Sequence, residues 1–156
     1  MRSSDSKVFS LHELKEVLSQ KKNEHVVFTN GCFDILHRGH VSYLQNARNL
    51  GDFLIVGVNS DHSVSRLKGP TRPIQNEEDR AFILAGLECV DAVILFEEDT
   101  PIRLIEQLLP NVLVKGGDYV IEEIVGYDVV TKNGGLVTTL PFVDGKSTSN
   151  IVKKMQ

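Results

Sequence analysis

Short apolar runs alternate with amphipathic segments along the chain, and this alternation predicts strands that are each followed by a helix. The runs cover residues 25–29, 53–58, 92–96, 112–114 and the segment between Gly135 and Leu140. They are rich in β-branched residues and have the length of strands that are buried on both faces. Because parallel strands need crossover connections, the pattern predicts one doubly wound α/β domain, with a mainly parallel, five-stranded, Rossmann-like sheet and helices on both faces.

Helix start signals lie between these runs. Ser10 with Glu13 three residues later has the pattern of a capping box. Asn76 precedes three acidic residues, which favour the first turn of a helix through the helix dipole. Thr100-Pro101 places a helix-capping residue before a proline, so we expect Thr100 as the N-cap and Pro101 as the first helical residue.

The segment between the first apolar run and the next helix has the features of a phosphate site. It reads Thr29-Asn30-Gly31-Cys32-Phe33-Asp34-Ile35-Leu36-His37-Arg38-Gly39-His40, and amphipathic spacing begins near Gly39. His37 and His40 would therefore lie at the positive end of a helix, where free N–H groups and the dipole attract anions. Gly39 allows close approach to the backbone. We predict a polyphosphate site here.

Polar or glycine-rich segments follow other strands as well. They are Asn59 to Asp61, Gly116-Gly117 and the serine-rich turn at 147–149. In doubly wound sheets, ligands bind beyond the carboxyl ends of the strands, near the point where the strand order reverses. We therefore expect one composite site at this edge of the sheet.

Composition narrows the function classes. The formal net charge of −4 disfavours a nucleic acid partner, and no apolar run reaches the ~20 residues of a membrane span. Cys32 and Cys89 are too few for a disulfide framework, and the polar start of the chain lacks the apolar core of a signal peptide. We expect a cytoplasmic protein with no membrane partner. It would form a single domain over residues 1–156 in which residues 1–8 are a flexible tail.

The motifs carry a resemblance to a known family. His37-Arg38-Gly39-His40 after a strand resembles the HxGH signature of the cytidylyltransferase-like nucleotidyltransferase superfamily. Three longer strings, at 58–61, 67–73 and 114–119, are similar to its bacterial branch that activates D-glycero-β-D-manno-heptose 1-phosphate with ATP. The resemblance extends from about Val26 to the C-terminus. It implies that a sugar 1-phosphate attacks the α-phosphorus of ATP, giving ADP-heptose, for lipopolysaccharide or a related glycoconjugate, and pyrophosphate.

The resemblance also implies roles for individual residues. Catalytic roles would belong to His37, His40 and Lys68. Nucleotide-binding roles would belong to Thr29, Asn30, Gly31, Cys32, Phe33, Gly39, Gly116, Gly117, Asp118, Ser147, Thr148 and Ser149, and substrate-binding roles to Asp34, Asn59, Arg72 and Arg80. We expect Mg²⁺ to accompany ATP, name no protein ligand for it, and expect a homodimer.

Structural readings of the same residues stay open at this point. Lys68 also suits a solvated loop lysine, and Arg80 a cation on a helix surface. Gly116-Gly117 suits either close approach of the backbone to a base or ribose, or a plain turn. The serine-rich turn suits a helix N-cap, which is compatible with phosphate binding.

Two other functions compete with sugar activation. The first is cytidylyl transfer to a small phosphorylated alcohol such as glycerol 3-phosphate. It is weakened because Phe142 stands where that branch of the family has an arginine, although Lys146 offers a nearby charge. The second is a non-catalytic nucleotide-binding module. Many members of the heptose branch are fused to a sugar kinase, so we expect separate enzymes to supply the heptose 1-phosphate here.

Overall fold

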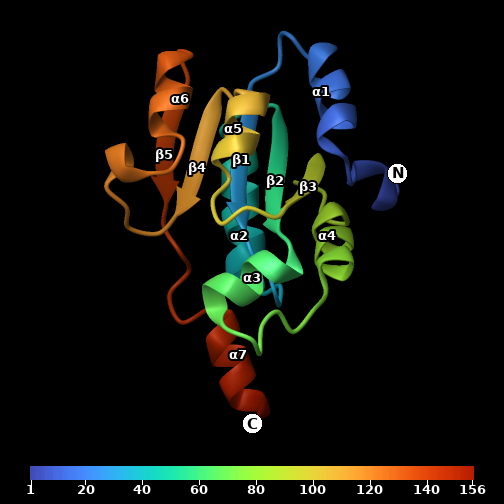
Figure 1. Cartoon of the computed structure of the whole chain (residues 1–156), viewed down its shortest axis with the longest axis vertical. Helices are drawn as coiled ribbons and strands as arrows, with labels where there is room; N and C mark the ends of the chain where they lie inside the picture. The colour runs from blue at the N-terminus through green and yellow to red at the C-terminus, as the bar shows by residue number, and fades with distance from the viewer.

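The computed structural model describes residues 1–156 and contains one sheet of five parallel strands (Figure 1). The predicted fold class is therefore confirmed. The strands lie in the order β3-β2-β1-β4-β5. Their bounds are β1 Val26–Gly31, β2 Phe53–Asn59, β3 Ala92–Phe96, β4 Val112–Gly116 and β5 Leu136–Leu140. Because the order reverses between β1 and β4, a ligand crevice is expected beyond the carboxyl ends of these two strands.

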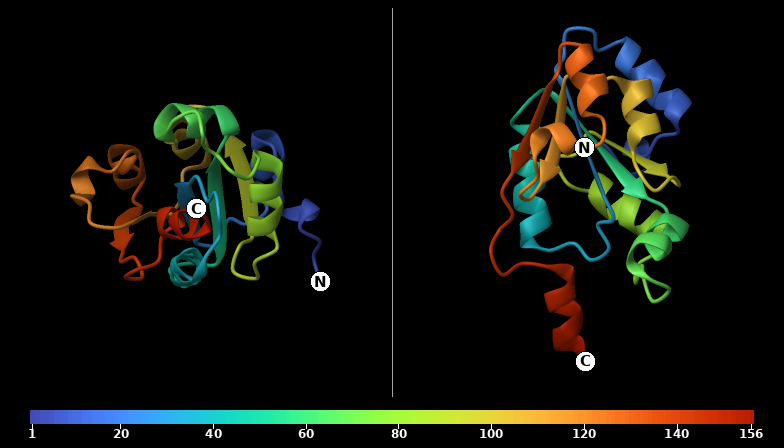
Figure 2. Two further views of the ribbon diagram at one scale, coloured as in Figure 1. Left: turned by 90° about the horizontal axis from the view of Figure 1, so that it is seen from below. Right: turned by 60° about the vertical axis from the view of Figure 1, so that its left-hand side comes forward.

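Seven α-helices and two short 3-10 helices connect and flank the strands. The α-helices are α1 Leu11–Ser19, α2 Arg38–Arg48, α3 Asp61–Lys68, α4 Glu77–Ala85, α5 Ile102–Leu108, α6 Tyr127–Lys132 and α7 Thr148–Met155. The 3-10 helices are η1 Asp5–Lys7 and η2 Ile121–Glu123. Helices cover both faces of the sheet, and α7 extends beyond the carboxyl ends of the strands (Figure 2). None of the helices has both the length and the apolar character that a membrane span needs.

Strand alternation divides the interior into two apolar cores. Neighbouring residues of β1 belong to different cores: Phe28 packs in the cluster that includes Leu14 of α1 and Ile105 of α5, and Val27 packs with Leu44 of α2 and Leu84 of α4. Consecutive side chains of a strand point to opposite faces, so a central parallel strand must be apolar at every position to serve both cores. This requirement explains the continuous apolar runs in the sequence.

Local capping signals predicted most helix starts correctly. Ser10 and Glu13 form the complete capping box, with Ser10 N–H donating to Glu13 Oε2 at 2.8 Å. Asn76 Oδ1 accepts from Asp79 N–H at 2.8 Å. The prediction for α5 was wrong by one residue, because the helix begins at Ile102 and Pro101 is its N-cap. The proline ring has no polar atom, so this cap makes no side-chain hydrogen bond.

The segment predicted as a flexible tail makes contacts along its second half. Lys7 Nζ donates to the carbonyls of Leu87 and Val90 at 3.1 and 2.8 Å. Val8 forms an isolated bridge to Val93 at the β3 edge of the sheet. These contacts hold residues 7 and 8 against the domain, and flexibility remains a prediction for the residues before them.

Candidate active site

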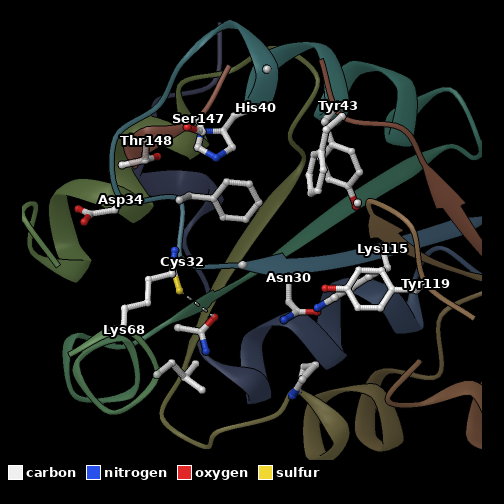
Figure 3. A pocket seen from close by; sticks show the side chains of 18 of the residues that line it. Asn30, Cys32, Asp34, His40, Tyr43, Lys68, Lys115, Tyr119, Ser147 and Thr148 are labelled. Atoms are coloured by element: carbon white, nitrogen blue, oxygen red, sulfur yellow. Dashed lines mark hydrogen bonds between the residues drawn. The ribbon is translucent and has the colours of Figure 1, made fainter. Parts of the chain in front are cut away.

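A cavity of about 750 Å³ opens at the carboxyl ends of the strands (Figure 3). Its lining comes from the β1–α2 turn, the ends of β2, α3 and β4, and the segment that leads from β5 into α7. The predicted site residues that border it are Asn30, Gly31, Cys32, Phe33, Asp34, His37, Gly39, His40, Asn59, Lys68, Gly116, Ser147, Thr148 and Ser149. The structure therefore brings together segments that the sequence separates by more than a hundred residues.

The cavity opens where two neighbouring strands stop pairing. β1 and β4 are paired at Val27 with Val112 and at Phe28 with Leu113, and no further pair follows. Both strands nevertheless continue, to Gly31 and to Gly116, so their ends diverge. The switch in strand order thus creates the crevice that the sequence predicted.

His37 caps α2 and turns its imidazole back toward the helix start. Its Nδ1 accepts a hydrogen bond from Gly39 N–H at 3.1 Å, so Nε2 carries the proton in the neutral ring. A Cβ at position 39 would lie 2.9 Å from His37 Cε1 and 3.2 Å from Lys146 Cβ. Glycine is required at position 39 because the imidazole and the Lys146 stem both approach the backbone there.

His40 stacks on His37 at the edge of the cavity. The ring centroids lie 3.9 Å apart with an angle of 23° between planes, and the edge of Phe33 closes the other side at 5.3 Å. His40 Nδ1 is buried and has no hydrogen-bond partner. Burial and the nearby positive charges of His37 and Lys68 lower the pKa of His40 to about 4. Burial and Lys146 also lower the pKa of His37. Both imidazoles are therefore neutral hydrogen-bonding groups at pH 7.

The start of α7 lies beside this pair of histidines. Ser147 caps the helix by accepting from Asn150 N–H at 3.1 Å, and Thr148 Oγ1 donates to the Ile35 carbonyl at 3.3 Å. The predicted N-cap is confirmed, and its hydroxyls and free N–H groups border the same cavity as His40 (Figure 3). This arrangement is a second helix N-terminus at one site, suited to an anion.

Lys68 is the last residue of α3 and borders the cavity from a third segment. It is exposed, and its side chain forms no ion pair or hydrogen bond within the protein. Its positive charge is nevertheless close enough to His40 to help lower the pKa of that imidazole. An unpaired lysine at this place is free to bind an anionic ligand.

Asp34 and Arg72 pair with each other in the structure. Asp34 is 2% exposed and accepts from Arg72 Nε at 2.6 Å and from the backbone N–H groups of Ile74 and Gln75. Burial alone would raise the pKa of Asp34, but these N–H donors and the guanidinium hold it below its usual range. Asp34 still borders the cavity, whereas Arg72 does not. The pair fixes the loop after Lys68, and a direct substrate contact by either residue stays a prediction.

Arg80 is placed differently from both sequence interpretations. Its side chain has no exposed surface, so it is not a cation on a helix surface, and it does not border the cavity. The guanidinium donates to the carbonyls of Cys32 and Asn59 at 2.7 and 2.8 Å and pairs with Asp61 at 2.8 Å. Arg80 thus joins the ends of β1 and β2, a positioning role in which four of its five N–H donors bond within the protein, the fourth acceptor being the Gln75 carbonyl.

Three of the predicted nucleotide-binding residues do not border the cavity. Thr29 is fully buried and its hydroxyl pairs with Tyr43 OH at 2.7 Å, which places Tyr43 rather than Thr29 at the cavity. Gly117 has a φ of 101° and packs under Phe142, so the space above it holds an aromatic ring. Asp118 follows this turn and also lies outside the lining.

Sequence reasoning missed several cavity residues, of which Lys115 has the clearest signal. Its ammonium is half-buried without a carboxylate partner, and burial lowers its pKa. It faces the Tyr119 ring at 5.8 Å (Figure 3). A lysine at the end of a buried strand could have been recognised, because such ends meet at the ligand edge of the sheet. No group of three or more His, Cys, Asp or Glu side chains is arranged to hold a metal ion.

The comparisons with known proteins agree with this geometry. A family model described as Cytidylyltransferase-like matches residues 28–153. The chain belongs to this family. Proteins of similar sequence include the Bifunctional protein HldE of Trichlorobacter lovleyi, 57% identical over 99% of this chain, and that of Campylobacter concisus, 55% identical over 97%. The chain spans about a third of the length of these curated relatives, 32% and 31% respectively.

Solved structures support the same assignment. A lipopolysaccharide core biosynthesis protein from Thermoplasma volcanium is 31% identical, with a TM-score of 0.64 over 80% of this chain and 100% of that one. A pantothenate synthetase from Thermus thermophilus, 21% identical with a TM-score of 0.55 over 88% of this chain and 62% of that one, shows the shared fold alone. The resemblance inferred from the HxGH motif and the longer strings is thus confirmed at the level of the family.

Proposed function

We propose that this cytidylyltransferase-like chain is a sugar-1-phosphate adenylyltransferase. It would join ATP and D-glycero-β-D-manno-heptose 1-phosphate to give ADP-heptose and pyrophosphate. The observation that supports this most is the convergence of His37 and His40, Lys68 and the Ser147–Ser149 turn on one cavity. The relatives named HldE and the lipopolysaccharide protein of known structure favour a sugar acceptor.

The residues suit a direct displacement at phosphorus. An oxygen of the sugar phosphate attacks the α-phosphorus of ATP, the bond to the bridging oxygen of the β-phosphate breaks, and pyrophosphate leaves. The attacking oxygen is already anionic at neutral pH, so no general base is needed. The enzyme must align two anions that repel each other and stabilise negative charge on the α-phosphate oxygens. Neutral His37 and His40 are hydrogen-bond donors for that charge.

The remaining polar groups divide the other tasks. The N–H groups and hydroxyls at the start of α7 would hold the β- and γ-phosphates, and Lys146 adds a charge beside them. Lys68 would bridge the sugar phosphate and the α-phosphate from the opposite segment. Lys115 provides a further unpaired cation on the β4 side of the cavity.

Mg²⁺ would enter with ATP. The structure provides no cluster of three ligating side chains, and Asp34 is already committed to Arg72. Mg²⁺ commonly keeps water and substrate phosphates as ligands, so a preformed protein cage is not required. The ion would neutralise part of the triphosphate charge, while the protein residues orient the two substrates.

Steady-state pyrophosphate release tests the proposal. The purified chain with Mg²⁺ is supplied with ATP or CTP, each combined with heptose 1-phosphate or glycerol 3-phosphate. We expect the highest kcat/KM for ATP with heptose 1-phosphate. A higher value for CTP with glycerol 3-phosphate would replace the substrate assignment with the alternative of an alcohol-phosphate cytidylyltransferase. ATP binding without turnover in any combination would favour a nucleotide-binding module instead.

A further inference from the structure

Phe142 is an exposed aromatic residue at the cavity for which the proposed reaction has no role. It borders the cavity, and 64% of its surface is accessible to solvent. It lies in the segment that leads from β5 to Ser147, the cap of α7. A large apolar ring left open beside a phosphate-binding turn requires an explanation, because its exposure forgoes the free energy of burial.

A pair of glycines at the end of β4 provides the place where this ring packs. A Cβ at Gly116 would lie 2.6 Å from Phe142 Cε1, and one at Gly117 would lie 2.7 Å from Phe142 Cε2. Contacts this close would displace the ring. The Tyr43 ring lies 6.5 Å away at an angle of 46°. The Gly116-Gly117 backbone therefore fixes Phe142 from one side and leaves much of the ring exposed at the cavity.

The neighbouring groups indicate what kind of ligand would cover the ring. The α7 start and the two histidines suit phosphates, and Phe142 offers an apolar aromatic surface on the same cavity. A nucleotide has both a phosphate end and a planar aromatic end. Tyr119, the other exposed aromatic residue of the lining, already faces Lys115 Nζ at 5.8 Å. Phe142 is thus the exposed ring of the lining that no cation faces, with Tyr43 as its aromatic neighbour.

We propose that Phe142 is the stacking surface for the nucleobase of the bound nucleotide. The inference rests on the proposed function in one respect, namely that the ligand is a nucleoside triphosphate. Every base has a π-face, so stacking adds affinity for nucleotides without selecting among the bases. It adds nothing to the affinity for an inorganic triphosphate, which has no base.

Fluorescence provides the first test, because the chain has no tryptophan. Phe142→Trp makes a single reporter at the proposed stacking surface, and Phe82→Trp makes a control on α4, where Phe82 is half-exposed and outside the cavity lining. We expect ATP to quench the fluorescence of F142W, tripolyphosphate to leave it unchanged, and F82W to respond to neither. Saturating ATP that leaves F142W unchanged would overturn the proposal.

Calorimetry provides the second test, which does not require a tryptophan ring at position 142. Phe142→Leu keeps an apolar side chain but removes the aromatic face. We expect the Kd of ATP and of GTP to rise by about 5- to 100-fold, as for the loss of a base-stacking partner. The Kd of tripolyphosphate should stay within about twofold. An unchanged Kd for ATP, or an equal loss for tripolyphosphate, would contradict stacking.

The two proposals can fail separately. Wild-type chain that binds ATP, with F142W quenched, but releases no pyrophosphate with any sugar 1-phosphate would contradict the proposed reaction and leave the stacking surface supported. Wild-type chain that forms ADP-heptose while F142L binds ATP unchanged would contradict the stacking surface alone.

Discussion

The imidazole of His40 lies stacked on that of His37, with centroids 3.9 Å apart, and neither ring has an acidic partner. Two stacked rings cannot both carry a positive charge at low cost, which agrees with the lowered pKa of His40, to which His37 contributes after burial. The pair is therefore suited to donate hydrogen bonds as neutral rings.

Replacing either histidine should reduce turnover far more than it reduces nucleotide affinity. We expect His37→Ala and His40→Ala each to lower kcat by about 10²–10³, the usual loss for one donor to a developing oxyanion. Because the rings touch, the double variant should lose much less than the product of the two single losses. His12→Ala, an exposed histidine of α1, is the matched control. The measurements are pyrophosphate release and ATP binding by calorimetry, and multiplicative losses would contradict a shared role.

Stability should decline as the pH falls from about 6.5 to about 4. In this range an unfolded histidine takes up a proton that folded His40, with its pKa lowered to about 4, resists. Its contribution is therefore complete above pH 6.5 and lost on acidification. We expect a loss of about 1–2 kcal/mol in the free energy of unfolding, reduced from the full linkage value because the ring is only partly buried.

The matched variant for this pH dependence is His40→Gln. Urea unfolding at several pH values should give a flatter profile for the variant between pH 6.5 and 4. Below about pH 4 both proteins should lose further stability, because Asp34, whose pKa is lowered, must then be protonated. Parallel profiles for wild type and variant above pH 4 would show that His40 is not the group responsible.

Lys115→Met should stabilise the protein and weaken substrate binding at the same time. The half-buried ammonium has no carboxylate partner, so a neutral side chain of similar length removes a desolvation cost. We expect a gain of about 0.5–2 kcal/mol in the free energy of unfolding, in the range of other stabilising substitutions. KM for an anionic substrate should rise about tenfold, the loss of one charge-assisted contact.

The control for Lys115 is Lys132→Met, an exposed lysine at the end of α6. It should change neither stability nor KM measurably. If Lys115→Met lowered stability and left KM unchanged, the ammonium would be a structural group rather than a ligand contact.

Arg80→Met should destabilise the fold strongly. It would leave the Cys32 and Asn59 carbonyls without their donor and Asp61 without its cation. Because the Asp61 side chain is 38% exposed, most of the cost comes from the unpaired carbonyls, and we expect a loss of about 2–4 kcal/mol in the free energy of unfolding. Arg103→Met, whose side chain is 72% exposed, should cost less than about 0.5 kcal/mol. Urea unfolding measures both, and an Arg80 variant as stable as the Arg103 variant would contradict the positioning role.

The sequence predicted the elements well because their signals are local. The Ser10–Glu13 capping box and the Asn76 cap depend on residues three apart, and the strands are continuous apolar runs. The composite site also followed from the sequence, since the carboxyl ends of parallel strands meet at one edge. The reaction and the roles of individual residues were inferred from the family resemblance, because residue spacing alone does not indicate them.

The roles of individual polar residues were less accessible from the sequence. Whether Asp34 contacts a substrate or Arg72 depends on a pairing between residues that are 38 apart in the sequence. The buried position of Arg80 likewise involves a hydrogen bond to the carbonyl of a residue 48 positions earlier. No local pattern marks a guanidinium that donates to the carbonyls at two strand ends. In the same way, the Gly116-Gly117 pair resembles a base-binding turn until the Phe142 ring is seen to pack on it.

A crystal structure of the chain with a non-hydrolysable ATP analogue, Mg²⁺ and heptose 1-phosphate tests the central claim most directly. We expect the α-phosphate within hydrogen-bond distance of His37 or His40, the β- and γ-phosphates at the start of α7 beside Ser147, and the sugar phosphate near Lys68. A triphosphate bound elsewhere, with His40 and Ser147 making no contact to it, would contradict the account.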